Sequence, residues 1–186
     1  MFWSEVFGVT AKNVRLHDDV IKGAIPYMLK LSISEKNFIK TEVGNILEEF
    51  TVTCCFDVSV VTLCEHSFDK NFKLAENTFI TLRRMVNNIG ENLPKLNFDS
   101  LKALMITLAK IIDSAKKGNM KTWAQEICIS MIELFGIENY YSLIQNTLGE
   151  QRIEYAKILV KTVEEKAKKN NKRESNIGGF INEVKD

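Results

Sequence analysis

The sequence predicts an all-α protein, built as an α-solenoid of about four helix pairs. Apolar residues recur at helical spacing along most of the chain, and only 2 Pro and 9 Gly interrupt its 186 residues. One phrase also occurs twice: Glu-Lys-Asn-Phe at 35–38 returns as Asp-Lys-Asn-Phe at 69–72, an offset of 34 residues. Each copy joins two apolar helical segments, as in a repeat unit that must stack on its neighbour to bury its apolar side. The alternating pattern also fits a globular helical bundle, and the duplicated phrase favours the solenoid.

Four helices are expected in the first half of the chain. They lie at about 17–33, 38–50, 57–68 and 71–88. Pro26 either kinks the first helix or shifts its start. The third segment is rich in β-branched residues, which makes a strand possible, but a lone strand between helices would have no partner. Gly90 is the expected terminator of the fourth helix.

Four more helices are expected in the second half. They lie at about 99–112, 123–135, 137–148 and 153–167. Asn97 and Asp99 are typical N-terminal caps for the first of these. Gly136 should end the second, and Gly149 begins the turn before the last. The expected domain therefore covers residues 1–170, followed by a polar tail at 171–186 that could contain a short docking helix.

The bulk composition excludes several classes of function. The net charge is +1, so the total charge favours neither a nucleic acid nor a membrane partner. No apolar run approaches the roughly 20 residues of a membrane span. The first residues lack the basic and apolar regions of a signal peptide, so we expect a cytoplasmic protein.

The sequence suggests no catalytic, metal or cofactor site. The four cysteines (Cys54, Cys55, Cys64 and Cys128) lack the spacing of a zinc site and are expected to be small buried side chains. His17 and His66 have no nucleophile or acid at a recognisable spacing. Arg83 and Arg84 are expected to be solvated charges rather than a phosphate site. Trp123 and the pair Tyr140 and Tyr141 are expected to pack between helices.

The turns within the helix pairs are the candidate binding site. In a stack of helix pairs the equivalent turns fall on one edge, and each turn here contains Lys or Arg. The candidate residues are Lys36, Asn37, Lys40, Lys70, Asn71, Lys73, Lys117, Lys121 and Arg152. Such an edge would suit an acidic partner surface. Lys and Asn are also common in exposed turns for solubility alone.

One stretch resembles the tubulin-binding TOG domains, especially those of the CLASP and crescerin types. Its pattern is Phe-Ile-Lys-x-Glu-Val-x-x-x-Leu-x-x-Phe over residues 38–50, followed by Cys54. The block from His66 through Lys70, Asn71 and Leu74 to Gly90 is similar to the next repeat of those domains. The resemblance covers residues 18–168 and is specific over 32–90. It implies a HEAT-repeat domain whose turns bind tubulin and which has no enzymatic activity. Because such domains usually have more repeats, one or two would be missing at the N-terminal end.

The sequence therefore leads to two functional hypotheses. The first is a tubulin- or microtubule-binding module of a cytoskeletal, ciliary or centrosomal protein. The second is an α-solenoid scaffold that binds a peptide, a partner protein or another copy of itself, without tubulin. RNA binding is disfavoured because the charge is neutral and the turns lack interleaved aromatic residues.

Overall fold

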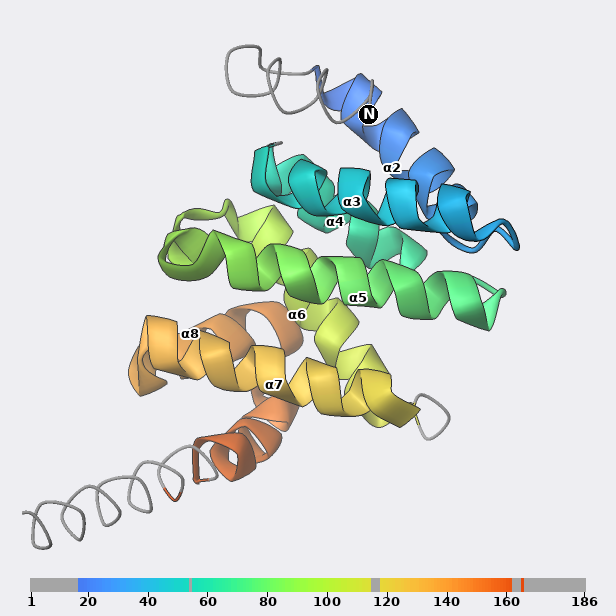
Figure 1. Cartoon of the computed structure of the whole chain (residues 1–186). Coiled ribbons are helices and arrows are strands. Elements are labelled where there is room, and N and C mark those ends of the chain that lie inside the picture. Colours follow the sequence, from blue (N-terminus) through green and yellow to red (C-terminus); the bar gives the residue numbers. More distant parts are fainter. Residues whose placement is uncertain (1–16, 54, 115–117, 162–164, 166–186) are drawn as a thin grey trace, which may run out of the picture. The chain divides into compact units, whose positions relative to one another are not determined.

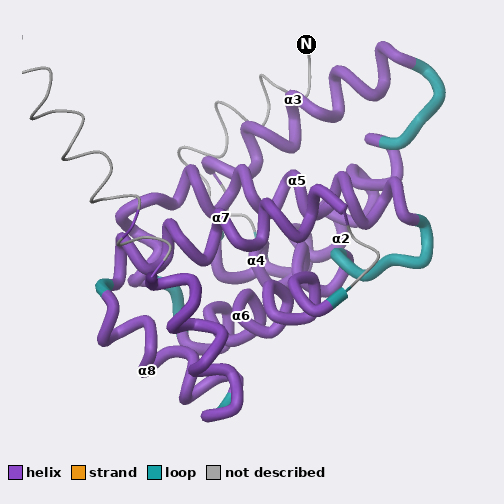
Figure 2. Tube along the Cα trace, turned by 90° about the horizontal axis from the view of Figure 1, so that it is seen from below, coloured by secondary structure: helices purple, strands orange, loops and turns teal. Residues whose placement is uncertain are grey.

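The computed structural model describes residues 17–53, 55–114, 118–161 and 165, and its regular elements are helices (Figure 1 and Figure 2). The α-helices are α2 (Asp18–Ser32), α3 (Asn37–Thr53), α4 (Phe56–His66), α5 (Phe72–Ile89), α6 (Phe98–Asp113), α7 (Gly118–Phe135) and α8 (Ile137–Leu148). Two 3₁₀ helices, η1 (Gly90–Lys95) and η2 (Glu150–Arg152), follow α5 and α8, and residues 153–161 are again helical. No strand occurs in these described ranges. The all-α prediction is confirmed, and the β-branched segment is helix α4.

The helix ends follow the local signals in the sequence. The Asn71 side chain accepts hydrogen bonds from the backbone N–H groups of Lys73 and Leu74 at the start of α5. Asn97 caps α6 in the same way. Gly90 ends α5 with a φ of 48°, a backbone conformation that favours glycine. Pro26 lies inside α2 and does not delay its start, because that helix begins at Asp18.

The chain divides into two compact units, residues 1–127 and 128–186, with the boundary inside α7. In the first unit, α2 packs against α3, α4 and α5, and α3 packs against α5. Helix α4 packs against α5 and α6. Helices α2, α3 and α4 therefore each contact the helix two places further along the chain. In the second unit, Tyr140 of α8 is buried, as are Ala156, Leu159 and Val160 of the helical stretch 153–161.

Buried positions in the first unit repeat every 35 residues. The first residues of α3 and α5, Asn37 and Phe72, are 35 apart. Buried pairs at that offset are Ile25 and Val60, Met28 and Leu63, Leu29 and Cys64, Ser32 and Ser67, Val43 and Thr78, Leu47 and Leu82, and Phe50 and Met85. The duplicated phrase has an offset of 34 residues, so it is displaced by one residue from the packing repeat.

The same burial register continues beyond α5 with a longer spacing. Ser59, Val60, Leu63 and Cys64 of α4 correspond at an offset of 41 to Ser100, Leu101, Leu104 and Met105 of α6, all buried. The increase from 35 equals the six residues of η1, which stands between α5 and α6. The longer connection thus increases the sequence spacing between α4 and α6, whereas the same positions of the two helices remain buried.

Two segments of the prediction lie outside the described residues. These are the apolar N-terminal stretch, residues 1–15, and the polar tail, residues 171–186. Cys54 and residues 162–164 and 166–167 of the last predicted helix also lie outside them. The assignment of residues 1–170 to one domain remains a prediction.

Candidate functional site

Two of the basic turns lie at one edge of the first unit. The turn between α2 and α3 and the turn between α4 and α5 lie on the same side in Figure 1 and in Figure 2. Lys36, Lys40, Lys70 and Lys73 are exposed there, and none forms an ion pair within the described part of the chain. We call these four lysines the turn edge.

Acidic side chains lie in the same turns and moderate the charge of the turn edge. Glu35 and Asp69 are both exposed. The carboxylate of Asp69 accepts a hydrogen bond from the backbone N–H of Asn71 at 2.8 Å, which holds the turn before α5. Four lysines therefore stand against two carboxylates, and the turn edge keeps a modest positive excess.

The two asparagines of the duplicated phrase have different roles. Asn71 precedes α5 and caps it, whereas Asn37 is the first residue of α3. In the first turn the backbone N–H of Lys36 donates to the hydroxyl of Ser34, as that of Asn71 donates to Asp69 in the second. The structural counterpart of Asn71 is therefore Lys36, which follows from the 35-residue register.

The remaining predicted site residues extend the turn edge only in part. Lys121 is exposed on α7 within the first unit, whereas Lys117 lies outside the described residues. Arg152 is half-buried in η2 and belongs to the second unit. The structure thus brings the predicted residues of the first two turns to one edge and leaves the wider row of four turns a prediction.

Arg83 and Arg84 each lie near a carboxylate, and Arg84 stays exposed to solvent. The guanidinium of Arg83 lies 2.6 Å from the Glu126 carboxylate and 5.7 Å from the centre of the Trp123 ring. Arg84 lies 3.9 Å from Glu48. Arg83 therefore links α5 to α7, and Trp123 packs between helices as predicted. The prediction of a solvated charge fits Arg84, whose side chain is 54% exposed, whereas Arg83 is 37% exposed and is held by Glu126, 43 residues away in sequence.

The two buried cysteines, Cys64 and Cys128, are unsuited to nucleophilic chemistry. Burial raises the pKa of Cys64 to about 12 and that of Cys128 to about 11. Cys128 is hydrogen-bonded to Tyr140, whose pKa burial also raises. A thiol with so high a pKa is not a thiolate at neutral pH. The prediction that cysteines pack as small buried side chains is confirmed for these two, whereas Cys55 is half-buried before α4.

No metal centre can be built from the described residues. Among them, no three His, Cys, Asp or Glu side chains lie close enough to hold an ion. His17 is exposed, and its Nδ1 accepts from the backbone N–H of Asp19 at the start of α2. Within the described residues, no helix is both long and apolar enough to cross a membrane.

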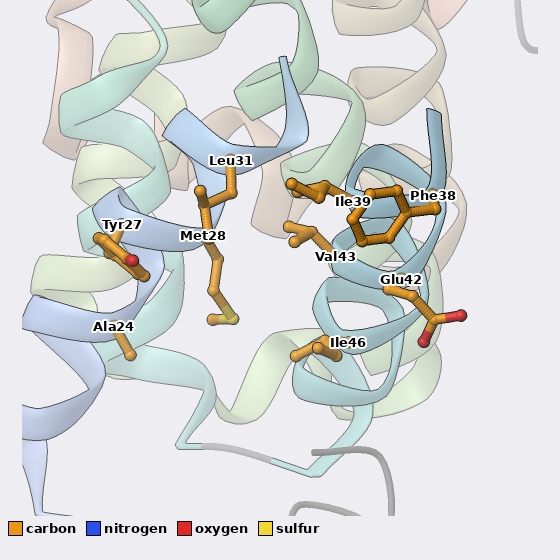
Figure 3. A pocket seen from close by; sticks show the side chains of 9 residues that line it. All are labelled: Ala24, Tyr27, Met28, Leu31, Phe38, Ile39, Glu42, Val43 and Ile46. Atoms are coloured by element: carbon orange, nitrogen blue, oxygen red, sulfur yellow. The ribbon is translucent and has the colours of Figure 1, made fainter. Parts of the chain in front are cut away.

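An apolar groove of about 600 Å³ lies between α2 and α3 and was not predicted from the sequence (Figure 3). Helix α2 supplies Ala24, Tyr27, Met28 and Leu31. Helix α3 supplies Phe38, Ile39, Val43 and Ile46, with Glu42 at the border. Tyr27 is 66% exposed and Phe38 is 69% exposed. We call this feature the α2–α3 groove.

Sequence and structure comparisons give no match for this chain. No protein-family model matches it, and neither a curated protein nor a solved structure shows significant similarity. The residues of the chain itself therefore carry the argument about function.

Proposed function

We propose that this chain is a HEAT-type α-solenoid that binds an acidic protein surface at its turn edge, with tubulin as the first candidate. The observation that carries the proposal is the position of Lys36, Lys40, Lys70 and Lys73 on one edge, exposed and without ion pairs in the described chain. Charged groups placed in this way steer a complementary surface and fix its orientation.

Three features support a solenoid carrying such an edge. The burial register repeats every 35 residues, and helices two places apart pack against each other. A stack of this kind presents an extended surface. Within the described residues neither the thiols nor the histidines form a catalytic constellation, so binding fits these features better than chemistry.

The proposal is tested by size-exclusion chromatography of the chain with and without soluble tubulin. We expect co-elution at low salt that weakens as salt is added, because the charges are exposed. The double variant Lys36→Glu/Lys70→Glu should bind at least about tenfold more weakly, since like charges facing each other at an interface cost several kcal/mol.

A matched control separates the turn edge from the total charge. The double variant Lys22→Glu/Lys102→Glu changes the net charge equally, at exposed lysines in the middle of α2 and on α6. It should bind as the parent does. Equal loss of tubulin binding in both variants would mean that binding depends on the total charge and not on the turn edge. Binding by neither the parent nor the control would exclude tubulin and leave the scaffold hypothesis.

A further inference from the structure

The turn between α4 and α5 presents two aromatic rings among its lysines. Phe68 is 39% exposed and Phe72 is 52% exposed. Lys70 and Lys73 stand next to them in the chain, exposed and without ion pairs within the described residues. We call Phe68, Lys70, Phe72 and Lys73 the aromatic turn. The expectation that the turns lack interleaved aromatic residues is therefore wrong here.

Hydrogen bonds hold the aromatic turn in one conformation. The Ser67 hydroxyl donates to the backbone C=O of Leu63 at 2.8 Å, and the backbone N–H of Asp69 donates to the C=O of His66 at 3.3 Å. The Asp69 carboxylate accepts from the N–H of Asn71, whose own side chain caps α5. A turn that is fixed before it binds loses less conformational freedom on binding.

A third lysine lies over one of the two rings. The ammonium of Lys110, in the last turn of α6, is 5.7 Å from the centre of the Phe68 ring. Lys110 is exposed, so its charge adds to that of the aromatic turn. Two apolar contact points thus lie beside three lysine charges, whereas the turn itself contains one carboxylate, Asp69.

The corresponding turn between α2 and α3 lacks these rings. At the 35-residue offset, Phe68 and Phe72 correspond to Ile33 and Asn37. Phe38, which matches Phe72 in the duplicated phrase, stands one position further into its helix and lines the α2–α3 groove (Figure 3). The two turns of the turn edge therefore share lysines, and the aromatic turn is specific to the second.

We propose that the aromatic turn is the anchor of the turn edge, and that its partner is an acidic peptide segment with apolar side chains. This inference rests on the proposed function, since it specifies the partner that the turn edge accepts. The apolar side chains would pack on Phe68 and Phe72. The carboxylates would pair with Lys70, Lys73 and Lys110. Aromatic side chains surrounded by polar groups often carry most of the binding energy at an interface.

Two features favour a peptide over a nucleic acid or a lipid surface. A nucleic-acid base binds by stacking on an open ring face, and Lys110 already lies over the ring of Phe68. Phe68 and Phe72 are each about half-covered, so they offer contacts of the size of a side chain rather than an apolar face that enters a bilayer.

The probes are two labelled peptides of equal charge. The first is Asp-Glu-Leu-Glu-Leu-Glu-Asp, and the second has serine in place of both leucines. Fluorescence anisotropy with the full chain should show saturable binding of the leucine peptide and at least tenfold weaker binding of the serine peptide. Added salt should weaken the binding of both, because the lysines are exposed.

Matched variants of the chain locate the contact. Phe72→Ser should weaken binding of the leucine peptide at least tenfold and leave that of the serine peptide unchanged, because only leucine packs on the ring. Phe98→Ser is the control and should bind both peptides as the parent does. Phe98 is likewise the first residue of its helix and 50% exposed, but it follows the far end of α5, a helix about 27 Å long. Circular dichroism verifies the fold of each variant.

The same measurements separate this inference from the proposed function. Equal binding of the two peptides, or equal loss in Phe72→Ser and Phe98→Ser, would overturn the apolar contact and leave the turn edge as a site for charge alone. Absence of saturable binding of the leucine peptide would also overturn the inference. So would tighter, Phe72-dependent binding of oligouridine or of phosphatidylserine vesicles. Leucine-peptide binding that Lys70→Glu does not weaken would contradict the charge pairing, and with it the proposed function.

Discussion

The helix pairs α2–α3 and α4–α5 have the same buried register but different surroundings. Ser59 and Thr62 of α4 lie under α2, whereas Ala24 and Tyr27 at the same positions border a groove. The residue types follow this difference: small polar side chains stand at the covered contact, and an exposed aromatic ring stands at the groove. The comparison teaches that an apolar groove on a repeat protein can be recognised from what covers its counterpart.

The largest expected effect comes from placing an aspartate at two equivalent positions, the covered Thr62 of α4 and the exposed Tyr27 of α2. Thr62→Asp would bury a charge between α4 and α2 and should lower the free energy of unfolding by about 3 kcal/mol or more. Tyr27→Asp, at the equivalent exposed position, should change it by no more than about 0.5 kcal/mol. Urea denaturation of both variants measures the difference. Equal losses would mean that the two positions are not equivalent.

A smaller effect separates the two asparagines of the duplicated phrase. Asn71→Ala removes the side-chain cap of α5 and should cost about 1 kcal/mol. Asn37→Ala places alanine inside the first turn of α3 and should be neutral or slightly stabilising. Thermal unfolding of the two single variants checks this. Equal destabilisation would favour the 34-residue alignment over the 35-residue register.

The hydrogen bonds between the two pairs should contribute less. Asn77→Ala removes the long contacts to Ser32 and should cost about 0.5 to 1 kcal/mol. Asn45→Ala, at an exposed position of α3, is the control and should cost nothing. Chemical denaturation would detect the difference, and a stable Asn77 variant would show that apolar packing alone joins the pairs.

The smallest effect at neutral pH concerns Cys64, whose counterpart in the first pair is Leu29. Burial raises the Cys64 pKa from 9.0 to about 12, so the folded state keeps its proton while the unfolded state loses it. The resulting contribution to stability is complete below pH 9 and is lost as the pH rises toward 12. Cys64→Ala should therefore flatten the alkaline part of a stability–pH curve, and an unchanged slope would contradict this.

Much of the fold could be predicted from the sequence, because helix signals are local. The apolar spacing and the caps at Asn71, Asn97 and Gly90 placed most helix ends within two residues. The packing register could not be read in the same way. The duplicated phrase reflects similar residues in the two turns, whereas burial depends on which helix packs against which. The phrase repeats after 34 residues and the buried positions repeat after 35.

Of the two candidate sites, the turn edge could be predicted from the sequence and the α2–α3 groove could not. Exposed lysines in turns were predictable, since polar turns between apolar helices reach solvent. The α2–α3 groove was not, because Tyr27 and Phe38 look like core residues in a helical pattern. The Arg83 contact was also hidden, since Glu126 and Trp123 lie on a different helix. The sequence does contain one signal for the groove: at the position of Tyr27, the next repeat has the small polar residue Thr62.

The main difference between the two helix pairs is that α2–α3 has an open apolar side where α4–α5 is covered by α2. Hydrogen exchange followed by mass spectrometry on the full chain tests this difference most directly. The amides of α2 and α3 should exchange faster than those of α4 and α5, because one side of the first pair lacks a packed neighbour among the described helices. Equal protection of the two pairs would contradict it.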